Sequence, residues 1–171
     1  LALSTLYLGW SFVAKFHVQG VAAESLAASG RDHDRIVTLA SPFNTNLWRI
    51  VAMDDTGYHV GWYSLLDDGG TVEFQHHQSD PGLLDGIDDH WPVARLRWFT
   101  KGFYRVSQID DSVVMTDLWM GIEDSYVFRF KVGVVGNPHS LPRPAEQLPS
   151  ELDTSRLPWL WARIRGLHKY P

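Results

Sequence analysis

The 171-residue chain contains no cysteine. Disulfide bonds and thiolate metal sites are therefore excluded, and the sequence gives no indication of the redox compartment. An excess of basic residues is also absent, because 15 Lys and Arg stand against 20 Asp and Glu, for a net charge of −5. Since a surface that binds nucleic acid is typically basic, the composition argues against nucleic acid as a partner.

Recognisable catalytic motifs are absent as well. The sequence contains no Gly-x-Ser-x-Gly elbow of the kind that presents a nucleophilic serine, and no two-histidine helical spacing of the metalloprotease type. It has no glycine-rich phosphate loop either, because Gly69 and Gly70 lie between two predicted strands, where a glycine pair is typical of a hairpin turn. We therefore predict no catalytic residue in this chain.

The densest group of metal-ligand residue types is His76 and His77 with Asp80. Adjacent residues of a strand point to opposite faces, so His76 and His77 cannot easily share one ion. A second concentration over residues 85–90 lies in a predicted loop, where acidic residues are typical turn formers. We therefore expect no metal and no other cofactor to bind these residues.

No hydrophobic run is long enough to cross a membrane. The longest, residues 1–14, begins without Met and ends at Lys15, whereas a spanning helix needs about 20 apolar residues. Apolar residues continue with a helical period until Ser29 and Gly30, so we predict one long helix over residues 1–30. Three interpretations remain open: the end of a truncated transmembrane helix, an amphipathic surface helix, and a core helix.

Beyond Gly30 the sequence predicts one α+β domain over residues 31–171, since this length favours a single domain. A short helix is predicted at 90–100, an extended proline-rich arm at 136–148 and a C-terminal helix at 157–168. Runs of strands without alternating helices indicate a mostly antiparallel, curved sheet of about six or seven strands, against which the long N-terminal helix packs. The predicted strands are residues 35–40, 46–53, 58–65, 71–76, 103–108, 112–118 and 126–134.

Charged residues lie inside three of the predicted strands, namely Arg49, Asp117 and Arg129. The favoured interpretation is that they lie on the solvent side of a half-exposed sheet. The alternative is that the three line one polar face and bind an anionic ligand. Trp48 and Trp62 are the aromatic residues through which the same sheet could bind a protein partner or a lipid headgroup.

Four stretches of the sequence together resemble a known family. They are residues 41–51 (SPFNTNLWRIV), 61–66 (GWYSLL), 98–104 (WFTKGFY) and 116–121 (TDLWMG) with 126–130 (YVFRF). They resemble the C-terminal region of the bacterial membrane-bound metal-dependent hydrolases, also called LexA-binding, inner membrane-associated hydrolases. The resemblance covers about residues 1 to 165.

The resemblance implies a membrane-embedded N-terminal half with a His-Arg-Gly-x-Thr-His-Ser motif, followed by a soluble C-terminal domain. This motif is absent here, so the family's metal ligands cannot be assigned to any residue of the chain, and a divalent metal would belong to the preceding part. Trp119 also departs from the pattern, since relatives are expected to carry Arg at this place. The full-length protein is expected in the inner membrane.

Three functional hypotheses follow. The leading one is an accessory or regulatory C-terminal domain of such a hydrolase, attached to the membrane through the preceding part. The second is a binding module that uses an aromatic-rich sheet face for a protein or ligand. The third is a self-contained enzyme with a pocket between the sheet and the first helix. A homodimer formed through the first helix is a further expectation.

Overall fold

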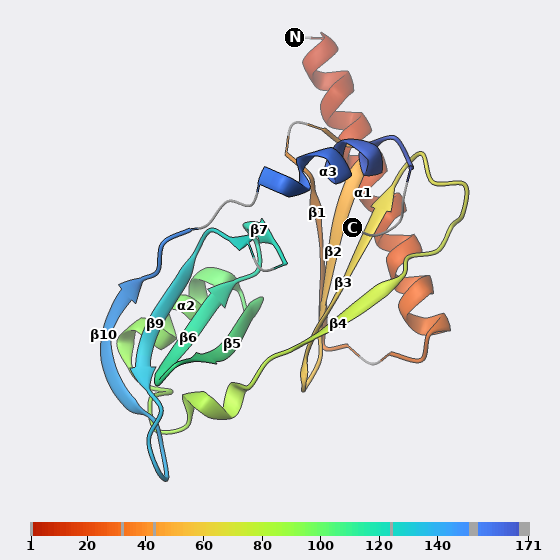
Figure 1. The fold of residues 1–171 in the computed structure, drawn as a ribbon. Coiled ribbons are helices and arrows are strands. Elements are labelled where there is room, and N and C mark those ends of the chain that lie inside the picture. The colour runs from red at the N-terminus through yellow and green to blue at the C-terminus, as the bar shows by residue number, and fades with distance from the viewer. Residues whose placement is uncertain (1, 32, 43, 124, 151–153, 168–171) are drawn as a thin grey trace. The chain divides into compact units, whose positions relative to one another are not determined.

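The structure is a computed structural model that describes residues 2–31, 33–42, 44–123, 125–150 and 154–167 (Figure 1). The chain forms two compact units. Unit 1 comprises Leu1–Asp55, His59–His77 and Thr154–Pro171, and unit 2 comprises Thr56–Tyr58 and Gln78–Asp153. The single domain over residues 31–171 stays a prediction.

Unit 1 begins with the helix α1, Ala2–Ala28, which confirms the long N-terminal helix expected from the apolar periodicity. Only its second half packs against the rest of the unit, through small and aliphatic residues with helical spacing. Gly30 ends the helix with a φ of 62°, a conformation in which glycine has no steric penalty. The buried apolar residues of α1 are Ala14, Val18, Val21, Ala22 and Leu26.

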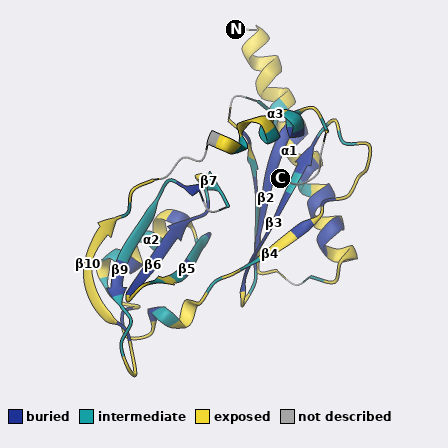
Figure 2. Cartoon of the chain, in the orientation of Figure 1, coloured by how far each residue is buried: buried dark blue, intermediate teal, exposed yellow. Residues whose placement is uncertain are grey.

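The first half of α1 has a different environment, because residues 2–10 are all exposed (Figure 2). No charged residue occurs among residues 2–14. Among the described residues, no helix reaches the combined length and apolar character that crossing a bilayer requires.

The four-stranded sheet of unit 1 has the order β1-β2-β3-β4. β1 and β2 pair antiparallel, with Thr38 opposite Ile50. The helix α1 and this sheet share one apolar core, to which the sheet contributes Trp48, Ile50, Ala52, Tyr63 and Phe74. Its strands are β1 (Arg35–Ala40), β2 (Leu47–Met53), β3 (Gly57–Ser64) and β4 (Phe74–Gln78).

The C-terminal segment, with η2 (Thr154–Arg156) and α3 (Leu157–Ile164), completes unit 1. Trp62 points to the face opposite Tyr63, because neighbouring strand residues alternate. There its ring meets that of Trp159 edge-on, with centroids 5.3 Å apart. Arg163 of the same helix donates to Asp67 and to the carbonyl oxygen of Trp62.

Unit 2 contains a second four-stranded sheet, with the order β10-β9-β6-β5 and antiparallel pairing throughout. Buried residues of η1 (Pro81–Leu84), α2 (Trp91–Thr100) and their connection pack with this sheet around Val106, Val113, Met115 and Val132. The strands of unit 2 are β5 (Tyr104–Ile109), β6 (Ser112–Asp117), β9 (Arg129–Val134), β10 (Leu141–Gln147) and the two-residue pair β7 (Gly121–Ile122) and β8 (Ser125–Tyr126).

The α+β class and the N-terminal helix are confirmed, but the expected strand count is wrong, since the described residues form ten strands. They are divided between two four-stranded sheets and one two-stranded ribbon. The predicted strand 126–134 is interrupted, and the proline-rich arm contains β10. Pro142 and Pro144 are compatible with β10 because it is an edge strand with a register shift between Pro142 and Glu146.

Candidate functional site

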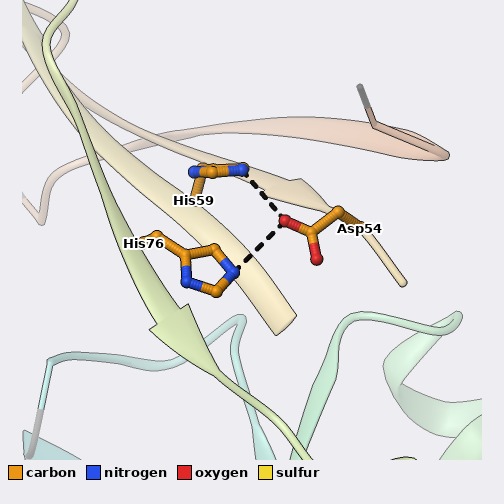
Figure 3. A group of neighbouring side chains, drawn as sticks. All are labelled: Asp54, His59 and His76. Atoms are coloured by element: carbon orange, nitrogen blue, oxygen red, sulfur yellow. Dashed lines mark ion pairs between the residues drawn. The ribbon is translucent and has the colours of Figure 1, made fainter. Parts of the chain in front are cut away.

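Three polar side chains converge in unit 1: Asp54 directly after β2, His59 in β3 and His76 in β4 (Figure 3). Strand alternation places them on the face that α1 covers, because each lies an even number of residues from a core residue beneath α1. These core residues are Ala52, Tyr63 and Phe74. The site therefore lies on the helix-covered face, at the end of the sheet where the β2–β3 turn is found.

A single carboxylate oxygen lies close to both histidines. Asp54 Oδ2 lies 2.9 Å from His59 Nε2 and 3.3 Å from His76 Nε2. The two imidazole rings have their centroids 4.9 Å apart and are inclined by 55°. One potential ligand atom from each residue lies within 4.8 Å of the others. Both histidines thus direct Nε2 toward the same point (Figure 3).

The members of the group differ in solvent exposure. The side chain of His59 is 10% exposed and that of Asp54 16%, whereas that of His76 is 36% exposed. Burial lowers the pKa of His59 below 6.5, and nearby His76 and Arg31 lower it further, while Asp54 opposes them. His59 is therefore mainly neutral at pH 7, the state in which imidazole is a metal ligand.

The second ring nitrogen of His59, Nδ1, is buried and has no hydrogen-bond partner within the described part of the chain. Arg31 lies beyond the end of α1, where its Nη1 donates to the carbonyl oxygen of Phe74 at 2.9 Å. The polar contacts of His59 are thus made at Nε2. This arrangement can act either as a hydrogen-bonded polar cluster or as a site for a cation.

The residues proposed from sequence for ligand binding in unit 1 lie on both faces of its sheet. Trp48 is 4% exposed in the core beneath α1, and its Nε1 donates to the carbonyl oxygen of Thr45 at 2.9 Å. Trp48 therefore cannot contact a partner across an open sheet face. Arg49 and Trp62 point to the opposite face, where Arg49 is buried and Trp62 packs on Trp159.

Asp117 and Arg129 lie in unit 2. Arg129 is opposite Thr116 in the β6–β9 register. Asp117, one residue later, points to the other face, where it is buried and its Oδ1 accepts from the backbone N–H of Trp119 at 3.2 Å. The alternative interpretation, in which Arg49, Asp117 and Arg129 line one polar face, is therefore wrong for Asp117 and Arg129. A ligand-binding role for Arg49, Asp117, Arg129 or Trp62 stays a prediction.

The sequence alone did not predict the group of Asp54, His59 and His76. The sequence groups His76 with His77 and Asp80, and it places Asp54 between the predicted strands 46–53 and 58–65. A usable signal was the short β2–β3 turn, which brings Asp54 near His59. Within the described residues this group is also the single set of three or more such side chains with ligand atoms this close.

The other predicted concentration of ligand-type residues, 85–90, forms no comparable cluster. Asp88 accepts from Arg97 Nη2 at 2.6 Å, and His90 Nε2 lies 2.8 Å from the carbonyl oxygen of Arg143. These side chains are thus engaged with separate neighbours.

Comparison of the chain with protein-family models, with curated proteins and with solved structures finds no match. The function is therefore inferred from the residues and geometry described above, together with the resemblance of the four sequence stretches.

Proposed function

We propose that this chain is a membrane-adjacent accessory domain of a bacterial membrane-bound metal-dependent hydrolase. The observation that carries the proposal is the exposed first half of α1. Leu3 in this segment is 83% exposed. The large apolar side chains that α1 exposes are Leu3, Leu6, Tyr7, Leu8, Trp10, Phe12, Val13 and Phe16.

These side chains surround the helix and do not form a single stripe. Leu6, Tyr7 and Leu8 are consecutive and all exposed, and consecutive helical residues point about 100° apart. A helix that is apolar on all sides is typical of a protein core or a bilayer. Because contacts with the sheet core begin only at Ala14, the apolar segment before it is best explained as lying in lipid or beside other membrane helices.

The accessory role is supported by the sequence. The chain resembles the C-terminal region of the hydrolase family but does not contain its His-Arg-Gly-x-Thr-His-Ser motif. In the proposed arrangement the family's metal and its chemistry belong to the preceding membrane-embedded part in the inner membrane. Units 1 and 2 would then regulate that part or bind its partners.

Vesicle flotation tests the membrane contact. We expect the chain to float with vesicles of phosphatidylethanolamine and phosphatidylglycerol. The triple variant Leu6→Gln, Leu8→Gln, Phe12→Gln should remain with the soluble fraction, because burial of large apolar side chains contributes about 1.5–3 kcal/mol each. All three residues are exposed, so the fold should persist. Trp98→Gln, which changes an exposed aromatic residue of α2, is the matched control and should still float.

A second copy of the chain is the competing occupant of the apolar segment. Sedimentation without vesicles distinguishes the two occupants. If the parent chain forms a dimer that the triple variant abolishes, and if the parent chain does not float with vesicles, the membrane contact is contradicted.

Family membership has its own test. An antibody against this chain should detect, in bacterial inner membranes, a protein longer than 171 residues, and detection only of a cytosolic species would contradict the proposal.

A further inference from the structure

We infer that Asp54, His59 and His76 form a binding site for a first-row divalent transition-metal ion, with two imidazole ligands and one carboxylate. The inference concerns this chain's own residues. It does not depend on the proposed membrane contact or on the hydrolase family, whose histidine motif is absent from this sequence.

The spacing of the ligand atoms fits a shared ion. Metal–nitrogen and metal–oxygen bonds of zinc are about 2.0–2.2 Å long, which places neighbouring ligand atoms of one ion about 3–3.5 Å apart. The distances from Asp54 Oδ2 to the two Nε2 atoms are 2.9 and 3.3 Å. These two distances are therefore close to those between ligands of one ion, and binding would bring the ligand atoms of the three residues, which lie within 4.8 Å of one another, to the same spacing.

The donor set selects the class of metal. Imidazole nitrogen suits zinc, iron, copper and nickel, whereas Mg²⁺ and Ca²⁺ prefer oxygen ligands. The single carboxylate compensates part of the charge of the ion. Three protein ligands leave at least one coordination position for water, and the partly exposed side chain of His76 provides a route from solvent.

The surroundings of the three residues also favour a bound metal ion, with one exception. His59 is nine-tenths buried, its Nδ1 has no hydrogen-bond partner in the described residues, and its Nε2 is directed at Asp54. Arg31 is the exception, since it is close enough to His59 to disfavour positive charge there. Arg31 should thus weaken metal binding. Its replacement should therefore raise the metal affinity, whereas replacement of a ligand should lower it.

Titration calorimetry of the whole chain with ZnCl₂ tests the inference, after removal of metals with a chelator. We expect one Zn²⁺ per chain at this site. His76→Gln should weaken binding about tenfold or more, because second-shell changes alone cost 10–100-fold in metal affinity and this change removes a ligand. Asp54→Asn should act in the same direction, and Arg31→Gln should strengthen binding.

The matched control is His77→Gln. His77 is the next residue of β4 and points to the opposite face, so its replacement should leave the affinity unchanged. Because His76 is exposed, the His76→Gln variant should fold, and circular dichroism verifies this. Absence of Zn²⁺ binding by the parent chain, or equal affinities of the His76→Gln and His77→Gln variants, would overturn the inference and leave a hydrogen-bonded polar cluster.

Discussion

Arg163 and Asp67 form a two-point ion pair between residues 96 positions apart in the sequence. Arg163 Nη1 donates to Asp67 Oδ1 at 2.7 Å, and Nη2 donates to Oδ2 at 2.6 Å. The side chain of Arg163 is 1% exposed and that of Asp67 is 8% exposed. This buried pair holds α3 against the β3–β4 connection of unit 1.

Replacing Arg163 should strongly destabilise the chain. Removal of one partner of a buried pair leaves the other charge uncompensated and costs about 3–5 kcal/mol. We expect Arg163→Met to lower the free energy of unfolding in urea by about this amount, and Arg163→Lys to rescue it only in part, because Lys cannot reproduce the planar two-point geometry. Arg165→Met, at an exposed neighbour, should change the free energy little. Equal values for the two Met variants would refute a stabilising role of the pair.

His59 should make stability depend on pH. Its pKa in the folded chain is lowered from 6.5, and burial, which disfavours the charged imidazole, is the largest cause. Between these two pKa values the unfolded chain binds more protons than the folded chain. The free energy of unfolding should therefore be constant above about pH 6.5 and should fall as the pH drops from 6.5 toward the lower pKa of the folded chain. Urea unfolding between pH 5 and about 8, with chelator present, measures the slope. In His59→Gln this part of the slope should vanish. A parent chain that gains stability toward pH 5 would contradict the assignment.

Gly61 is required by close packing beneath α1. A Cβ atom at this position would lie 3.0 Å from Phe74 Cδ1 and closer still to Val72 Cγ1. Because β-branched Val72 has little rotamer freedom, we expect Gly61→Ala to destabilise the chain by about 1–3 kcal/mol, as overpacked cores do. Gly20→Ala is the control, since no atom lies within 4 Å of its Cβ position in α1. That variant should gain up to about 1 kcal/mol from helix propensity. Thermal unfolding measures both changes in stability, which should be a loss for Gly61→Ala and a gain for Gly20→Ala.

Ser25 connects α1 to the segment that leads into β4. Its hydroxyl donates to the carbonyl oxygen of Val21 at 2.7 Å and accepts from the backbone N–H of Val72 at 2.9 Å, in a buried environment. Ser25→Ala should cost about 1–3 kcal/mol, because the Val72 N–H loses its acceptor. Ser11 makes the same hydroxyl-to-carbonyl bond to Tyr7 in the exposed half of α1. Ser11→Ala should be nearly neutral in the same urea experiment, and similar losses in both variants would show that the bond to Val72 contributes nothing.

The elements that the sequence predicted well are those with strong local signals. α1 follows from the apolar period that ends at Gly30, and β2 and β3 closely match the predicted strands 46–53 and 58–65. The division into two sheets could not be predicted, because strand signals do not specify which strands pair. β10 was missed since Pro142 and Pro144 are unfavourable in most strands and are tolerated here only at an edge.

The candidate metal site was missed for a related reason. Asp54 and His59 are close in sequence, but His76 reaches them only through the position of β4 beside β3, after a connection of irregular structure. Strand alternation correctly separated His76 from His77. It could not identify the residues on the neighbouring strand with which His76 would be combined.

Unit 1 is built from segments that lie far apart in the sequence, which has a consequence for its folding during synthesis. Its last segment, which contains Arg163, follows the entire contiguous stretch Gln78–Asp153 of unit 2. During synthesis from the N-terminus, nearly all of unit 2 therefore emerges before Asp67 can meet its ion-pair partner. We expect a nascent chain that stops before α3 to show a protease-sensitive first unit and a protected second unit, and a released chain that includes α3 to be protected in both units.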